Sequence, residues 1–285
     1  MILFDLWLWP LLAVVLLPGL LVYFGLHVVE RGVIFVDLAL AQIAALGVCV
    51  AIVLGAHAGG HSHTYLMSLL FTLLGAALFS LTRFRHPRVP QEAIIGIIYV
   101  VAAAAATVVL SRTAEGDEAL KSLLVGNILL VGKEEVLRTF ALYIVIALTH
   151  FLLRDRFIMI SFQEEEATRL GARLRLWDFM FYATFGLVVT SFVQIMGVYL
   201  VFSYLIVPAV CGAILSERIV TRLIIGWTVA LVTGVAGLLT SVEIETLDLP
   251  TGPTTVCLFG VTLLFCAGLA WLKTRQSSGS GPDYS

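Results

Sequence analysis

The chain has 285 residues, of which 60% are hydrophobic and 13% are charged, and its mean hydropathy is +1.03. Soluble domains are roughly 45–50% apolar and 25% charged, so the composition excludes an ordinary soluble protein. The formal net charge of −2 gives no indication of a nucleic-acid partner. We therefore expect a single all-α integral membrane domain over residues 1–275, surrounded by lipid and followed by a disordered polar tail at residues 276–285.

Nine apolar blocks, separated by short polar breaks, are each long enough to cross a bilayer as a helix. The first has no basic leader or cleavage site, so we expect it to be retained as a membrane helix. The sixth and seventh meet at Met196 and Gly197 and could form one bent unit, and Pro208 should kink or break the seventh. The expected spans are 7–28, 37–56, 65–82, 92–111, 136–153, 177–196, 197–215, 221–240 and 254–272.

Positive charge alternates between the connections. Thirteen of the 17 Lys and Arg residues fall in every second connection, and the other four lie in the alternate ones. Cytoplasmic loops of membrane proteins carry the excess of basic residues. The pattern predicts an N-terminus outside the membrane and a C-terminus in the cytoplasm.

Two further segments are not expected to span the membrane. Residues 123–131 are apolar but short and flanked by charges, which favours an interfacial or re-entrant segment. Residues 161–176 are polar and fall on the expected cytoplasmic side. Ser161 and Glu164 have capping-box spacing, and Gly171 is a natural stop, so we expect a short surface helix here.

Five polar side chains within or beside the spans are candidates for function, because polar groups are costly in hydrocarbon. Asp37, Glu92 and Asp178 each open an expected helix, where an acid stabilises the helix dipole by about 0.3–1 kcal/mol. Asp37 could instead lie close to a central conduit. Gln42 and Gln194 lie deeper, and each either bridges two helices or lines a polar cavity.

Three histidines share one outer connection: His57, His61 and His63. Neutral imidazoles are common ligands for zinc and related metals, so this loop could capture an ion, although solvated loop histidines would give the same pattern. His27 and His150 lie near helix ends and are expected to be structural. The sequence shows no nucleophile–base pair and no phosphate-binding glycine loop, so we expect a chain that is not itself an enzyme.

Several short patches together resemble the permease subunit of the bacterial ABC importers for zinc, manganese and ferrous iron. They follow one another in the family's order over nearly the whole chain. The patches are Phe35-Val36-Asp37-Leu38-Ala39-Leu40-Ala41-Gln42 to Gly47, Glu92-Ala93-Ile94-Ile95-Gly96-Ile97, Leu124-Val125-Gly126-Asn127-Ile128-Leu129, Ser161-Phe162 to Gly171, Gln194-Ile195-Met196-Gly197-Val198 to Ala209, and Asp248-Leu249-Pro250-Thr251-Gly252-Pro253.

The resemblance implies a fold similar to the type II ABC importers and a location in the bacterial inner membrane. It implies four kinds of partner: a second permease subunit, identical or paralogous, two cytoplasmic ATPases and an extracytoplasmic metal-binding protein. The implied cargo is zinc or manganese, with no covalent cofactor. By the resemblance, residues 161–171 dock on the ATPase, with the contact residues Ser161, Phe162, Glu164, Glu165, Ala167, Leu170 and Gly171.

One departure from the family concerns the metal. Family members commonly carry Asp-Ala-x-Ser-His in the second helix, whereas here Gln42 stands at the histidine and Ala41 at the serine. The acid, Asp37, comes one residue early, before Leu38. Asp37 and Gln42 remain the candidate oxygen ligands. The alternative functions are an importer of a metal chelate or cofactor, and a non-transporting scaffold or sensor subunit.

Overall fold

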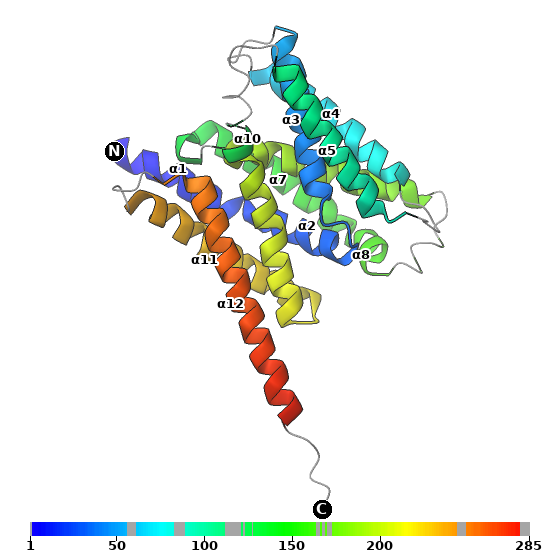
Figure 1. Cartoon of the computed structure of the whole chain (residues 1–285), viewed down its shortest axis with the longest axis vertical. Helices are drawn as coiled ribbons and strands as arrows, with labels where there is room; N and C mark the ends of the chain where they lie inside the picture. The colour runs from blue at the N-terminus through cyan, green and yellow to red at the C-terminus, as the bar shows by residue number, and fades with distance from the viewer. Residues whose placement is uncertain are drawn as a thin grey trace, which may run out of the picture.

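The computed structural model describes residues 2–55, 61–82, 89–111, 121, 123–126, 128–163, 166, 169, 173–243 and 249–279. Within these ranges the chain is helical, with short connections and no strand (Figure 1). The helices are α1 Ile2–Leu16, α2 Pro18–Glu30, α3 Val36–Val53, α4 His61–Thr82, α5 Gln91–Leu110, η1 Ile128–Leu130, α7 Lys133–Leu152, α8 Arg154–Phe162, α10 Arg173–Leu215, α11 Ile219–Glu243 and α12 Thr251–Gly279.

Eight helical stretches in the described ranges are long and apolar enough to cross a membrane, and one of them joins α1 and α2 over Trp7–Glu30. Burial separates a centre from a periphery. In α3, 72% of the most apolar window is buried, against 17% in α12. The peripheral helices expose leucine, valine and isoleucine side chains, as surfaces that face lipid or another subunit do.

The longest helix, α10, changes direction at Gly197. Its 43 residues would extend about 64 Å if straight, roughly twice the hydrocarbon thickness. Gly197 has φ 76° and ψ 164°, and the helix segments on either side run in different directions (Figure 1). If the two halves of α10 are counted separately, the eight stretches of the described ranges become nine, the number of spans that the sequence predicts. The helix does not break at Pro208, because α10 continues through it to Leu215.

The segment predicted to be short and non-spanning packs against this kink. It is helical at residues 123–125, turns at Gly126 with φ 68°, and continues as η1. A Cβ atom on Gly126 would lie 2.2 Å from the carbonyl carbon of Met196. One on Gly252, at the start of α12, would lie 2.6 Å from Val125 O. Glycine therefore allows three backbone segments, distant in sequence, to meet at one junction.

Two boundaries differ from the expectation. Helix α12 continues to Gly279, four residues into the expected tail, and residues 280–285 lie outside the described ranges. Helix α10 begins at Arg173, so Asp178 is its sixth residue. The interpretation of Asp178 as an acid that opens the helix is therefore wrong.

Candidate functional site

Asp37 and Gln42 both lie on α3, which is buried between α4, α5 and α10. Asp37 is 1% exposed, and neither of its carboxylate oxygens has a hydrogen-bond partner within the described structure. Gln42 is 4% exposed. In a helix with 3.6 residues per turn, side chains five apart differ by about 140° around the axis. The unbroken helix therefore directs the two side chains to different faces. They are poorly placed to share one metal ion, and a metal site at either residue would need ligands from another helix.

Another acid near the start of α3, Glu92 of α5, has a hydrogen-bond partner. Glu92, in the first turn of α5, accepts a hydrogen bond from the backbone N–H of Ile34 at 3.1 Å. It therefore fixes the connection between α2 and α3 to α5. Asp37 differs from it, because its carboxylate is buried and no described donor reaches it.

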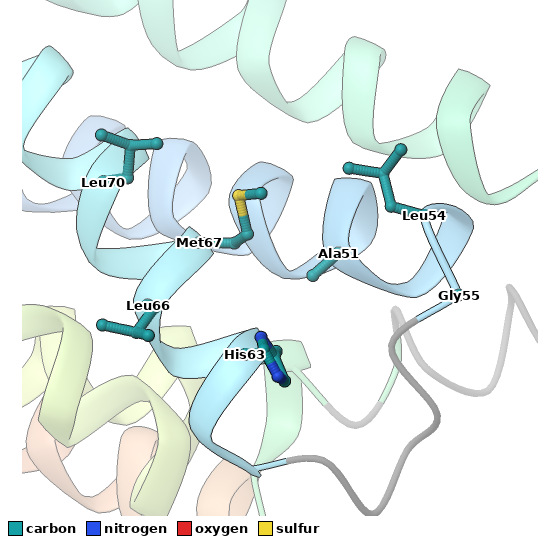
Figure 2. A pocket seen from close by; sticks show the side chains of 7 residues that line it. All are labelled: Ala51, Leu54, Gly55, His63, Leu66, Met67 and Leu70. Carbon is teal, nitrogen blue, oxygen red and sulfur yellow. The ribbon is translucent and has the colours of Figure 1, made fainter.

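One of the three candidate histidines, His63, lines a cavity between α3 and α4. His57 lies outside the described residues, and His61 is the first residue of α4. The cavity has a volume of about 490 Å³ and is lined by Ala51, Leu54, Gly55, His63, Leu66, Met67 and Leu70 (Figure 2). Of these side chains, only His63 and Met67 carry a metal-ligating atom. Among the described residues, no group of three His, Cys, Asp or Glu side chains could hold a metal ion.

The segment expected to dock on an ATPase begins differently from the prediction. Ser161 and Phe162 are the last two residues of α8, and Ser161 is buried. Ser161 is therefore not a helix N-cap. Its hydroxyl instead makes long-range hydrogen bonds to His27 and Arg31. Further along, Glu166 and Arg169 are helical and exposed. The remaining expected contact residues, Glu164, Glu165, Ala167, Leu170 and Gly171, lie outside the described residues.

Ser161 belongs to a buried group that we call the polar cluster, made of His27, Arg31, Ser161 and Asp178. The Ser161 Oγ atom lies 2.8 Å from His27 Nδ1 and accepts a hydrogen bond from Arg31 Nε, also at 2.8 Å. Arg31 Nη1 lies 3.1 Å from Asp178 Oδ1, and these two side chains are 4% and 0% exposed. A buried ion pair of this kind keeps its partners together, because breaking it leaves an uncompensated charge.

Aromatic rings surround the polar cluster and extend it to α7. The Arg31 guanidinium lies 3.8 Å from the centroid of the Phe181 ring. His150 of α7 stacks on Phe157 of α8 with the ring centroids 4.0 Å apart, and its nitrogens face Tyr23 Oη at 3.2 Å and Thr184 Oγ1 at 2.9 Å. The structural role expected of His27 and His150 matches these contacts.

The sequence reasoning did not find the polar cluster. Arg31 contributed only to the charge count, and Asp178 and Ser161 were assigned to helix ends. The available signal was a basic and an acidic residue that both border expected spans on the same side. Nothing local pairs them, because 147 residues separate Arg31 from Asp178.

The described residues form an all-helical fold with several helices long and apolar enough to cross a membrane, which defines a polytopic membrane protein. The chain belongs to the ABC 3 transport family, whose model matches residues 4–270.

Among its relatives, the manganese transport system membrane protein MntC of Listeria monocytogenes is 25% identical over 63% of this chain and 66% of its own length. MntC of Bacillus subtilis is 27% identical over 90% and 59%, respectively. The chelated iron transport system membrane protein YfeD of Yersinia pestis is 27% identical over 67% and 64%. The matches thus span slightly less than two thirds of these relatives.

The fold is also found in a solved structure of PsaBC from Streptococcus pneumoniae in complex with Fab. The two chains superpose with a TM-score of 0.75 at 19% identity, covering 92% of this chain and 91% of that one. The agreement over almost the whole chain confirms the permease fold expected from the sequence.

Proposed function

We propose that the chain is the permease subunit of an ATP-driven importer for a divalent transition metal, manganese or zinc. The observation that carries the proposal is the match of one transport family over residues 4–270. The relatives support a metal cargo, because their names specify manganese and chelated iron. Hydrolysis of ATP would come from a separate subunit, because no nucleotide-binding motif occurs in the sequence.

The proposed complex contains a second permease subunit, two ATPases and an extracytoplasmic metal-binding protein in the bacterial inner membrane. The exposed residues Glu166 and Arg169 support an ATPase contact after α8, since both are helical and available on the surface. ATP binding at that contact would shift the permease pair between outward-open and inward-open states.

The donor atoms on α3 support a preference for manganese over zinc. Asp37 and Gln42 offer oxygen, and oxygen ligands suit manganese better than zinc, which favours nitrogen and sulfur. The two unpartnered oxygens of Asp37 support a cation contact there. Because the two side chains lie on different faces of α3, we propose that each meets the ion at a different step of transport.

Transport by the reconstituted complex tests this function. Proteoliposomes would contain the chain with its ATPase and binding protein, and uptake of manganese and zinc would be measured with ATP and with a non-hydrolysable analogue. We expect ATP-dependent manganese accumulation that zinc competes with only weakly. A complex that hydrolyses ATP but accumulates neither ion would contradict the metal assignment and favour a chelate or cofactor as cargo.

The proposed orientation has its own test. Single cysteines would be introduced at Lys121 and at Lys273 in a background without native cysteines, and intact cells would be treated with a membrane-impermeant thiol reagent. We expect labelling at position 121 only, because position 273 belongs to the basic, cytoplasmic set. Labelling of position 273 from outside would reverse the orientation.

An importer of a metal chelate remains the second candidate. It is favoured by the chelated iron relative and by the replacement of the family histidine by Gln42. Uptake of labelled iron chelate in the same proteoliposomes, without uptake of the free ions, would select it.

A further inference from the structure

One hydroxyl joins α8 to α2. The Oγ atom of Ser161 lies 2.8 Å from both Arg31 Nε and His27 Nδ1, and Ser161 itself is 8% exposed. An arginine Nε–H can only donate, so the serine oxygen accepts there and its own proton is available to His27 Nδ1. Both bonds form where little water can replace them. Ser161 therefore holds the end of α8 to the end of α2.

The same arginine joins α2 to α10. Its Nη1 atom donates to Asp178 Oδ1 at 3.1 Å, and the guanidinium lies over the Phe181 ring. Since both charged side chains are nearly fully buried, α2 and α10 cannot separate here without leaving a charge unpaired in the interior. The ends of α2, α8 and α10 consequently behave as one mechanical unit.

The position of this unit in the chain suits transmission of movement. Among the described residues, Ser161 is the last buried one before the exposed residues Glu166 and Arg169. From Asp178, α10 continues without a break to the kink at Gly197, about 28 Å away along the helix. There Gly197 touches the backbone of Gly126. A displacement that begins beyond α8 would thus reach the kink of α10 through the polar cluster.

We propose that Ser161, Arg31 and Asp178 are positioning residues that transmit movement of the ATPase-docking segment to α2 and α10. The proposal rests on the proposed function only for the existence of an ATPase partner. It does not depend on the transported cargo.

Spin-label distance measurements on the complete complex test the proposal. One label would be placed at Leu54, directly after the end of α3, and the other at Tyr199, beside the α10 kink. Both residues are exposed, and the labels would report movement far from α8. Distances would be compared without nucleotide and after trapping with ATP and vanadate. Ser191→Ala is the matched control, because in the described structure this buried hydroxyl donates to Leu187 O of its own helix, away from the labelled positions.

We expect the wild-type complex and Ser191→Ala to show the same nucleotide-dependent shift. Ser161→Ala should lose at least half of the shift while ATP hydrolysis stays within twofold of wild type. A full shift in Ser161→Ala would overturn the proposal. So would a wild-type complex with no shift, since there would be no movement to transmit.

A double variant separates transmission from folding. Arg31→Met with Asp178→Leu removes both charges while roughly conserving volume, so it should assemble where the single variants leave an unpaired charge. We expect it to assemble and to lose the shift. An assembled double variant with the wild-type shift would make the ion pair purely structural. Metal uptake by the wild-type complex is measured separately, and its absence would refute the metal cargo without changing these distances.

Discussion

Replacing Gly197 by alanine should destabilise the junction between α10 and the short segment before η1. The φ of 76° with ψ of 164° lies in a region that is essentially restricted to glycine, and a non-glycine residue there costs about 1–3 kcal/mol. The new Cβ atom would also lie 2.4 Å from Gly126 N and 2.5 Å from the Val125 carbonyl carbon, so the two backbones must separate by about 1 Å.

Those two effects together lower the free energy of unfolding by at least about 2 kcal/mol, which corresponds to a decrease in Tm of roughly 4–8 °C. A thiol-reactive dye that reports exposure of the buried Cys49 and Cys211 would follow thermal unfolding in detergent. Gly260→Ala is the matched control, because it lies in helix α12 with nothing within 4 Å of its Cβ position. If Gly197→Ala melted within 1 °C of that control, the close approach to Gly126 would be refuted.

Four further substitutions test other parts of the molecule. Asp37→Asn keeps the shape of the side chain but removes its charge, and it should reduce metal uptake at least tenfold at equal expression. Gln42→His should raise zinc uptake relative to manganese uptake. Unchanged uptake and selectivity in both variants would make these residues structural. Leu170→Asp should leave ATP hydrolysis active while uptake falls, because an apolar contact expected in an ATPase groove is lost; normal transport would contradict the docking assignment. Tyr204→Phe removes a buried hydroxyl that has no partner in the described structure, so it should raise the free energy of unfolding by about 1 kcal/mol, and a lower Tm in the dye assay would contradict this.

The membrane helices could be predicted because their determinants are local. A hydrocarbon layer about 30 Å thick requires about 20 consecutive apolar residues per helix, and that requirement is visible in any single stretch of sequence. The block at 92–111 corresponds to α5 Gln91–Leu110, and the block at 136–153 to α7 Lys133–Leu152. The shortness of 123–131 likewise predicted a segment that does not span the membrane.

The family and its permease fold were also predictable, because several patches kept their order along the chain. Residues 35–47 and 92–97 fall at the starts of α3 and α5, as that pattern requires. The candidate metal ligands were less accessible to sequence reasoning. Whether Asp37 can bind a metal ion depends on which side chains from other helices face it. The spacing of residues along one helix does not contain that information.

Only the tertiary structure decided where the polar groups at the helix ends go. Ser161 has a genuine capping-box spacing, yet its hydroxyl bonds His27 and Arg31, which are more than 120 residues away. Asp178 pairs with Arg31 in the interior and does not open its helix. The direction of α10 changes at Gly197, where the backbone of Gly126 approaches closely, whereas the helix does not break at Pro208. The sequence by itself therefore determined which segments enter the membrane, since the bilayer acts on each segment separately. The fold decided how these segments are joined, since each joining contact needs two residues that only folding brings together.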